Sequence, residues 1–214
     1  MRKLSIQILV ANKSWFLPYA QKLKAALEGE NHGTELITAE NRVKKGDILF
    51  ILSWENIIKK EILARHEHNI VIHASALPKG RGWSPLTWQI LEGKNKIPVS
   101  LFEAGDKADS GPIYLQETFT LAGYELLDEM REKLGQKIIA LALKFVKNCR
   151  TIKPKAQKGK PTFYPKRGPE HSEVGVKTPL AKIFNQFRAA DNERYPVFFK
   201  HKGHKYILKI YKAE

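Results

Sequence analysis

The run Asp47-Ile-Leu-Phe-Ile-Leu-Ser53 is apolar without interruption over the length of one strand. A strand of this kind is buried on both faces, which is typical of a parallel sheet with helices on each side. Outward from it, Leu4–Ala11 predicts a first buried strand, and Phe16–Leu27 carries apolar side chains at helical spacing. This alternation of strands and helices predicts an α/β fold with a mostly parallel sheet.

The remaining elements follow the same spacing rules. Short strands are predicted at residues 35–38, 69–73, 98–103 and 112–119, and helices at 57–64, 85–91 and 123–149. Ser84 before Pro85 predicts an N-cap for the second of these helices. Arg150–Glu173 is rich in Lys, Pro and Gly and has no hydrophobic period, which indicates a linker or an extended strap.

The chain divides into three predicted parts. Residues 1–149 form the α/β domain, residues 150–177 the linker, and residues 178–214 a small α+β subdomain of one helix and a terminal hairpin. In an open α/β sheet, ligands bind beyond the carboxyl ends of the strands. Those ends carry Ala11–Ser14, Ser53–Asn56 and His73–Ser75, so we expect these segments to line a site.

Composition limits the class of protein. Of the 214 residues 43% are hydrophobic, enough for a packed core, and no apolar run is long enough to span a bilayer. The first apolar segment is typical of a strand and not of a secretory signal. The single Cys149 excludes an internal disulfide and a cysteine-based zinc cluster, which fits a reducing cytoplasm. We therefore expect a cytoplasmic protein without membrane contact.

The chain is strongly basic, with a formal charge of +15 from 37 Lys and Arg against 22 Asp and Glu. Such an excess indicates anionic partners, for example nucleic acid, membrane headgroups or nucleotides. A solvated basic surface without a partner explains the charge equally well. The charge alone therefore does not identify a partner.

A histidine ends one predicted strand and begins an irregular loop. The segment is His73-Ala-Ser-Ala-Leu-Pro-Lys-Gly-Arg-Gly-Trp-Ser-Pro85, and its loop leaves backbone N–H and C=O groups free for a ligand. A lone histidine at a strand end is more often a packed core or surface residue. However, a second loop ends in Ala108-Asp109-Ser110-Gly111 between two strands and can bring a carboxylate to the imidazole. For Asp109 the alternative is an ordinary turn residue before Gly111.

Together these motifs resemble the folate-dependent formyltransferases, which include methionyl-tRNA formyltransferase, glycinamide ribonucleotide transformylase and the sugar-nucleotide N-formyltransferases. The family pattern is Asn-x-His, a Ser-Leu-Leu-Pro-like loop, Arg-Gly and a later Asp-x-Gly. The matching positions here are His73, Ser75-Ala-Leu-Pro78, Arg81-Gly82 and Asp109-Ser-Gly111. Asp47–Ile58 matches the strand and loop that hold the pterin in that family, and Leu180–Phe199 resembles the segment after its catalytic domain. The resemblance implies a Rossmann-like formyltransferase fold, with residues 1–149 as the catalytic domain and residues 178–214 as a truncated C-terminal subdomain.

The resemblance also implies the catalytic roles. His73 would handle the proton of the attacking amine, and Asp109 would orient the imidazole and accept the proton. Where the family carries Asn two residues before the histidine, this chain has Val71, which cannot donate to an oxyanion. Asn69 is about 13 Å from His73 along the strand, too far to replace it. The donor is then His73 as imidazolium, Ser75, a backbone N–H or water, and an impaired enzyme is the alternative.

The co-substrate implied by the resemblance is 10-formyltetrahydrofolate, without a metal. The residues assigned to its binding are Ser53, Trp54, Glu55, Asn56 and Ile57, then Ser75, Leu77 and Pro78, then Phe102, Ala104 and Gly105. The segment Phe102–Asp106 is expected to offer mainly backbone groups. For Trp54, packing in the core is nearly as good an interpretation, and Trp88 is expected in the core of its helix. The candidate contacts to the acceptor are Asn12, Lys13 and Trp83.

The predicted acceptor is a nucleotide-linked amino sugar. The loop after His73 is most similar to the small formyltransferases of pseudaminic-acid-type sugar synthesis and to the formylation domain of some peptide synthetases, which implies a UDP-linked 4-amino-4,6-dideoxy sugar. The tail is shorter than the barrel with which methionyl-tRNA formyltransferases hold tRNA, so nucleic acid is not the expected partner. The alternatives are a methionyl-tRNA formyltransferase and a catalytically impaired folate- or sugar-binding module. A face of the terminal hairpin is a candidate homodimer contact.

Overall fold

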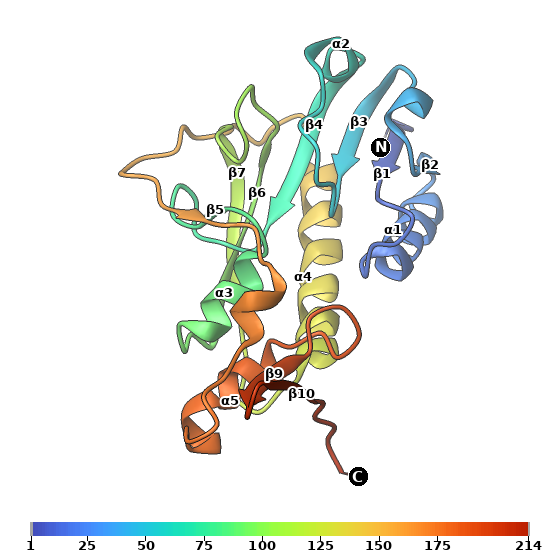
Figure 1. Ribbon diagram of the computed structural model, residues 1–214. Coiled ribbons are helices and arrows are strands. Elements are labelled where there is room, and N and C mark those ends of the chain that lie inside the picture. The colour runs from blue at the N-terminus through green and yellow to red at the C-terminus, as the bar shows by residue number, and fades with distance from the viewer. Residues whose placement is uncertain (1, 214) are drawn as a thin grey trace.

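The computed structural model describes residues 2–213, which form a six-stranded sheet with the order β2-β1-β3-β4-β6-β7. The strands are β1 (Ser5–Leu9), β2 (Gly33–Ile37), β3 (Gly46–Ile51), β4 (His66–His73), β6 (Lys96–Glu103) and β7 (Ile113–Thr120). The first four run parallel, while β6 and β7 are antiparallel to their neighbours. The predicted mostly parallel sheet is therefore confirmed (Figure 1).

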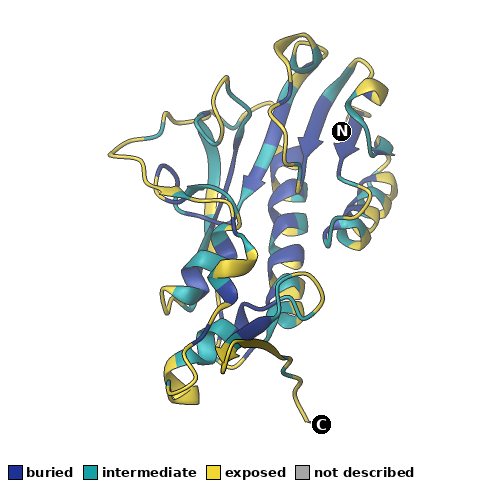
Figure 2. Cartoon of the chain, in the orientation of Figure 1, coloured by how far each residue is buried: buried dark blue, intermediate teal, exposed yellow. Residues whose placement is uncertain are grey.

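Two hydrophobic cores lie on opposite faces of this sheet. On one face, α1 (Leu17–Gly29) and α4 (Leu127–Asn148) pack against alternate strand residues, among them Ile48 and Phe50 of β3. On the other face lies a smaller cluster, here called the minor core, which consists of Leu9, Ile37, Val43, Leu49, Ile51 and Ile58. Because β3 contributes to both cores, its sequence is apolar at every position, as the run 48–52 indicated. Figure 2 shows β3 and its neighbouring strands mainly in the colour of buried residues.

The minor core decides which face of the sheet carries the candidate site. Val71 of β4 packs against the minor core. Since side chains alternate along a strand, His73 lies on this same face and not on the face covered by α4. On this face lie the 3-10 helix η1 (Glu40–Arg42) and the short helix α2 (Lys60–Leu63), whose Ile62 and Leu63 pack against the minor core.

Three local predictions differ from the structure. Ser84 takes the predicted N-cap position before α3 (Pro85–Leu91), but its side chain makes no capping hydrogen bond and its backbone is left-handed (φ 47°, ψ 48°). The last helix of the α/β domain begins at Leu127 and not at Gly123, because the Glu125 carboxylate accepts the N–H groups of Ala122 and Gly123 in a turn. The helix predicted over 57–64 is shortened to α2.

The segment predicted as a linker is a strap that is bonded to the α/β domain (Figure 1). Lys155 pairs with Ile113 at the edge of β7, and β8 (Phe163–Tyr164) pairs in parallel with β5 (Arg81–Gly82) in the loop after His73. Trp88 is half-buried and not a core residue, and its Nε1 donates to the Pro165 carbonyl at 3.0 Å. The strap therefore follows an extended course because the loop that it crosses supplies its hydrogen-bond partners.

The C-terminal part contains η2 (Pro169–Ser172), α5 (Leu180–Arg188) and the antiparallel hairpin of β9 (Val197–His201) and β10 (His204–Leu208), which was predicted. A small cluster of its own, with Phe187 and Val197, holds these elements together. Arg188 is fully buried, and its Nε donates to the Glu125 carbonyl at 3.2 Å. Among residues 2–213, no helix is long and apolar enough to cross a membrane. The division at residues 149 and 177 stays a prediction.

Candidate active site

The candidate site begins at the carboxyl end of β4, where His73 is the last strand residue. Its backbone pairs with Ser100 of β6, and its side chain is 11% exposed. The Nε2 atom of His73 lies 2.8 Å from the carbonyl oxygen of Gly80, in the loop that follows the strand. Because a carbonyl oxygen only accepts, Nε2 carries the hydrogen in this arrangement and Nδ1 is the basic ring nitrogen.

Asp109 is the second member of the pair, as the spacing of the two loops suggested. Its Oδ2 atom lies 3.8 Å from Nε2 of His73, and the carboxylate is 14% exposed. The same oxygen accepts the backbone N–H of Gly82 at 2.7 Å. The structure thus brings the two predicted catalytic side chains together, and a backbone donor from the His73 loop holds the carboxylate in place.

Close backbone approach explains two of the glycines in the motifs. A Cβ on Gly111 would lie 1.8 Å from the Glu103 carbonyl oxygen, and a Cβ on Gly82 would lie 2.5 Å from the Tyr164 carbonyl oxygen. Gly82 also has a positive φ of 97°. Only glycine allows both approaches without displacing backbone. Gly111 therefore determines the course of the loop that carries Asp109, and Gly82 that of the loop after His73.

Val71 lies two residues before His73, at the position where the sequence pattern described above has an asparagine. It pairs with Ile51 and Phe102 in the neighbouring strands and packs in the minor core. Asn69, one more pleat away, donates through Nδ2 to the Leu63 carbonyl at 3.0 Å. Its side-chain donor is therefore used by the fold and cannot reach the His73 end of the strand.

Ser75 is the nearest candidate for the missing donor. It is 2% exposed, and its Oγ has no hydrogen-bond partner among the described residues. A Cβ on Gly80 would lie 3.1 Å from Cβ of Ser75, so the serine side chain lies beside the residue that holds the His73 ring. An unpaired buried hydroxyl is costly in a fold, which makes a functional partner a reasonable explanation.

The other residues of the His73 loop are mainly structural in this arrangement. Leu77 and Pro78, predicted as folate contacts, are buried. Ser100 Oγ donates to the Ser75 carbonyl at 2.6 Å and accepts the N–H of Leu77 at 3.4 Å. The loop is therefore rigidly attached to β6, and any ligand contact would involve the edges of these buried side chains.

The segment after β3, residues 53–57, carries another group of predicted folate contacts. Ser53, Glu55, Asn56 and Ile57 are exposed, and Ile57 exposes 65% of its surface although it is apolar. Trp54 packs on the minor core and donates through Nε1 to Glu40 at 3.0 Å. Ser14, from the end of β1, donates through Oγ to Ser53 Oγ at 2.8 Å. This bond places the exposed Asn12 and Lys13 near the segment after β3.

The loop between β6 and β7 carries the remaining predicted folate contacts. Ala104 touches the minor core, and its N–H donates to the Asn69 carbonyl at 2.6 Å. Of the N–H groups in residues 104–111, the described structure pairs those of Ala104 and Ser110, so others, including that of Gly105, are available to a ligand. The side chain of Phe102 is fully buried, which leaves only its backbone as a candidate contact. Lys60 of α2 reaches Asp106 of this loop at 3.0 Å.

Glu103 fixes the start of this loop. Burial raises the pKa of the Glu103 carboxyl, although hydrogen bonds from the backbone N–H of Asn69 and from the Tyr114 hydroxyl at 2.9 Å act in the opposite direction. Burial, with Glu103 as a neighbour, also raises the pKa of Tyr114. These contacts join β4, β6 and β7 at the point where the Asp109 loop begins.

The strap supplies residues that sequence reasoning did not select. Hydrogen bonds to the loops that carry His73 and Asp109 come from three strap residues, Gln157, Thr162 and Tyr164. The candidate acceptor contact Trp83 is half-buried, and Nζ of Lys166 lies 4.5 Å from its ring centroid. No periodicity or motif marks these strap residues in the sequence. Their role depends on which loop the strap crosses, and only the tertiary structure contains that information.

Comparison with known proteins agrees with this geometry. A family model described as formyl transferase matches residues 11–142. The methionyl-tRNA formyltransferase of Thermodesulfovibrio yellowstonii is 28% identical over 162 residues, which cover 72% of this chain and 53% of that protein. The corresponding protein of Caldicellulosiruptor saccharolyticus is 27% identical over 173 residues, covering 78% and 54%. The chain thus spans about half the length of the curated relatives that it matches.

Solved structures share the fold over nearly the whole chain. Methionyl-tRNA formyltransferase from Clostridium thermocellum has a TM-score of 0.83 at 27% identity and is covered over 94% of its chain, with 99% of this chain matched. HypX from Aquifex aeolicus in complex with tetrahydrofolic acid has a TM-score of 0.84 at 19% identity, with 98% of this chain and 38% of that chain covered. A sugar N-formyltransferase from Shewanella has a TM-score of 0.75 at 14% identity, with 99% and 98% covered.

The last two likenesses show the fold alone, since their identities are low. The family match is different, because it spans more than half of the chain and includes the strand end with His73 and the loop with Asp109. This chain therefore belongs to the formyl transferase family.

Proposed function

We propose that this chain is an N-formyltransferase that moves a formyl group from 10-formyltetrahydrofolate to a primary amine. The observation that carries the proposal is the pair of His73 and Asp109, 3.8 Å apart at the carboxyl edge of a parallel sheet. The names of the curated relatives and the tetrahydrofolate-bound neighbour support the same chemistry.

Formyl transfer places three demands on a site. The amine must approach the formyl carbon, a proton must leave the amine, and a negatively charged oxygen must be stabilised in the tetrahedral intermediate. Nδ1 of His73 is the basic nitrogen while Nε2 donates to Gly80, so it can accept the proton of the amine. The resulting positive ring faces the Asp109 carboxylate, which stabilises it electrostatically. The ring can then return the proton to N10 of the folate as the bond between the formyl carbon and N10 breaks, which releases tetrahydrofolate.

The residues of the site fit a folate donor. A pterin needs an apolar surface with hydrogen-bonding groups at its edge, and the partly buried Trp54 and Ala104, which pack on the minor core, offer the first. The unpaired backbone groups after Ala104 offer the second. The unpartnered Oγ of Ser75 supports a role in stabilising the developing oxyanion, because Val71 cannot do so.

A nucleotide-linked amino sugar, in particular a UDP-4-amino-4,6-dideoxy sugar, stays our prediction for the acceptor. The exposed Lys13 and Lys166, whose Nζ lies 4.5 Å from the ring centroid of Trp83, provide positive charge for its phosphates. A homodimer through the terminal hairpin is part of the same prediction.

A second candidate acceptor is methionyl-tRNA. It is supported by the names of the curated relatives at 27–28% identity and by the solved chain from Clostridium thermocellum, of which 94% is covered. The charge of +15 suits a nucleic acid. This candidate predicts binding that weakens steeply as salt rises.

One assay separates these acceptors. Purified protein is mixed with 10-formyltetrahydrofolate and either a panel of amino-sugar nucleotides or initiator methionyl-tRNA, and the release of tetrahydrofolate is followed. Turnover with a sugar nucleotide alone supports the first acceptor, and turnover with the tRNA alone overturns it. Folate binding without turnover on any acceptor indicates an impaired binding module. Turnover that is unchanged in His73→Ala contradicts the assigned chemistry.

A further inference from the structure

Gln157 of the strap connects the two loops that present His73 and Asp109. Its Nε2 donates to the carbonyl oxygens of Asp109 and Gly111, both at 2.8 Å. Its Oε1 accepts from Nη2 of Arg81 at 2.6 Å. Arg81 belongs to the loop after His73, so this single side chain joins both loops from a third segment of the chain.

The three hydrogen bonds require an amide at this position. Carbonyl oxygens only accept and a guanidinium only donates, so one amide orientation satisfies all three partners. Glutamate has the same length but would place an acceptor against the two carbonyls, and it would lose both donated bonds. Lysine could donate to the carbonyls but would repel Arg81.

Asp109 needs such restraint because its backbone is left-handed, with φ of 52°. A non-glycine residue in this region costs about 1–2 kcal/mol and persists only where its surroundings determine it. Gln157 binds the carbonyl of Asp109 itself and that of Gly111, on either side of Ser110. It therefore fixes the peptide units from which the Asp109 carboxylate projects.

The strap is held firmly on both sides of Gln157. Before it, Lys155 and Ile113 exchange two backbone hydrogen bonds of 2.8 Å. After it, the Thr162 carbonyl accepts the N–H of Arg81 at 3.0 Å, and Thr162 Oγ1 accepts the N–H of Gly80 at 2.8 Å. Gly80 is the residue whose carbonyl holds the His73 ring. Gln157 thus lies between two strap residues, Lys155 and Thr162, that hydrogen bonds to the α/β domain hold in place.

We propose that Gln157 is a positioning residue for formyl transfer, which sets the placement of the Asp109 carboxylate relative to the His73 ring. The inference rests on the proposed function of that pair. Gln157 touches neither ring nor carboxylate of the pair directly, so its effect is transmitted through the loop backbone. A misplacement of about 1 Å in a catalytic group can cost about 10²-fold in rate.

Kinetics separate positioning from folding. Gln157→Glu, Gln157→Asn and Gln157→Ala are compared with Lys158→Ala, the exposed next residue, as the matched control. The substrate pair is 10-formyltetrahydrofolate with whichever acceptor of the sugar-nucleotide and methionyl-tRNA panel the wild type uses. We expect kcat to fall by about 10-fold to 100-fold in the Gln157 variants, with KM for the donor changed less than about threefold. Lys158→Ala keeps wild-type values.

A ligand-free measurement tests the same inference without turnover. The ¹⁵N resonances of the His73 ring, assigned by their loss in His73→Gln, report the hydrogen bond of Nε2 and the charge beside it. We expect these resonances to move in Gln157→Glu and Gln157→Ala and to stay unchanged in Lys158→Ala, while the unfolding temperature of Gln157→Asn stays near that of the wild type.

Each outcome has a distinct meaning. Wild-type kcat and unmoved ring resonances in the Gln157 variants overturn the positioning role, as does a loss of activity that only follows a loss of folded protein. If His73→Ala also retains turnover, the proposed function itself fails. If His73→Ala is inactive while Gln157→Glu is fully active, only the role of Gln157 fails.

Discussion

The ring of His73 lies 3.8 Å from Oδ2 of Asp109 but donates its Nε2 hydrogen to the Gly80 carbonyl, and the Asp109 oxygen instead accepts the N–H of Gly82. The two side chains are therefore close neighbours that each bond to the backbone of the same loop, and they are not directly hydrogen-bonded to each other. Each is attached to the loop between residues 80 and 82, so that loop determines their separation. The first prediction follows from this geometry.

Asp109→Asn should lower kcat by about 10²–10⁴-fold, the usual contribution of a general acid–base group. The amide oxygen still accepts from Gly82, so the loop keeps its shape while the negative charge beside the ring is lost. His73→Gln should have an effect of similar size. Steady-state release of tetrahydrofolate measures both, and Asp106→Asn on the exposed part of the same loop is the control. Full activity in Asp109→Asn would contradict an electrostatic role.

Ser75→Ala should lower kcat by about 10²–10³-fold, because its Oγ is the proposed oxyanion donor in place of an amide. The hydroxyl has no partner among the described residues, so its removal should leave the free energy of unfolding unchanged or raise it. Adding Val71→Asn to this variant should restore activity at least partly, because Val71 faces the same side as His73. Denaturant unfolding and kinetics on the three proteins test this, and an active Ser75→Ala variant would exclude Ser75 as the donor.

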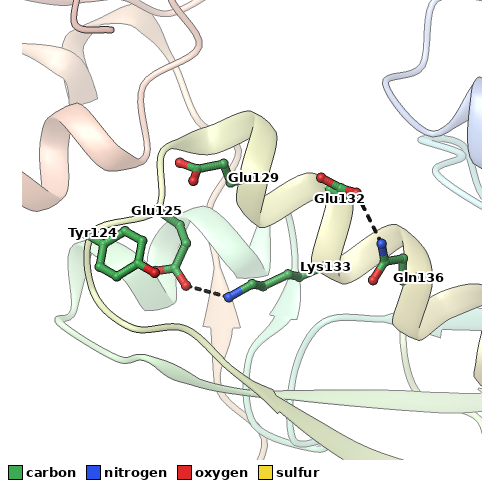
Figure 3. A pocket seen from close by; sticks show the side chains of 6 residues that line it. All are labelled: Tyr124, Glu125, Glu129, Glu132, Lys133 and Gln136. Atoms are coloured by element: carbon green, nitrogen blue, oxygen red, sulfur yellow. Dashed lines mark hydrogen bonds and ion pairs between the residues drawn. The ribbon is translucent and has the colours of Figure 1, made fainter. Parts of the chain in front are cut away.

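Acid should weaken the attachment of the C-terminal part through Glu125, whose carboxylate also bonds to Lys133 (Figure 3). Burial raises the pKa of Glu125, but hydrogen bonds from Lys133 at 2.6 Å and from the backbone of Ala122 and Gly123 outweigh it and lower the pKa to about 2. A carboxyl with a depressed pKa stabilises the fold above its unfolded pKa. This stability, about 3 kcal/mol, should be lost as the pH falls from about 4.5 to about 2.

Glu125→Gln removes this dependence and leaves the buried Arg188, whose Nη2 is 3.7 Å from Glu125, without its charge partner. Breaking such a pair costs about 3–5 kcal/mol. Glu132→Gln is the control, since Glu132 is exposed on the same helix, bonds to Gln136 and should contribute less than about 1 kcal/mol. Urea unfolding at several pH values measures both variants. An unchanged slope of stability against pH in Glu125→Gln would contradict this assignment. The groove of about 300 Å³ beside Glu125 shares no residue with the candidate active site.

Gly111→Ala should displace the Asp109 loop, because its Cβ would lie 1.8 Å from the Glu103 carbonyl oxygen. We expect a loss of at least about 2 kcal/mol in unfolding free energy and nearly complete loss of turnover. Gly29→Ala at the end of α1 is the matched control, since nothing lies within 4 Å of its Cβ. The unfolding free energy of that variant, measured by thermal unfolding, should be about 0.5–1 kcal/mol higher than that of the wild type. Equal stability of the two variants would contradict the steric argument.

The amino-acid sequence by itself determined the sheet and the two catalytic candidates. The apolar run of β3 requires burial on both faces, and this local pattern is sufficient to predict a parallel strand with its neighbours. His73 and Asp109 were identifiable because each stands at a strand end or between strands, in motifs that resemble those of the formyltransferases. The register of β4 then placed Val71 and His73 on one face, as strand alternation requires.

Only the tertiary structure decided what the strap does and how Ser84 is used. The segment 150–177 has no period, because its hydrogen-bond partners lie in distant loops and not in itself. Ser84 follows the β5–β8 pairing and has a left-handed backbone, so its side chain makes no capping bond at the N-cap position that the sequence predicts. The role of Gln157 has the same origin. An isolated amide carries no signal in a sequence, and its three partners meet only when the chain between residues 81 and 157 has folded.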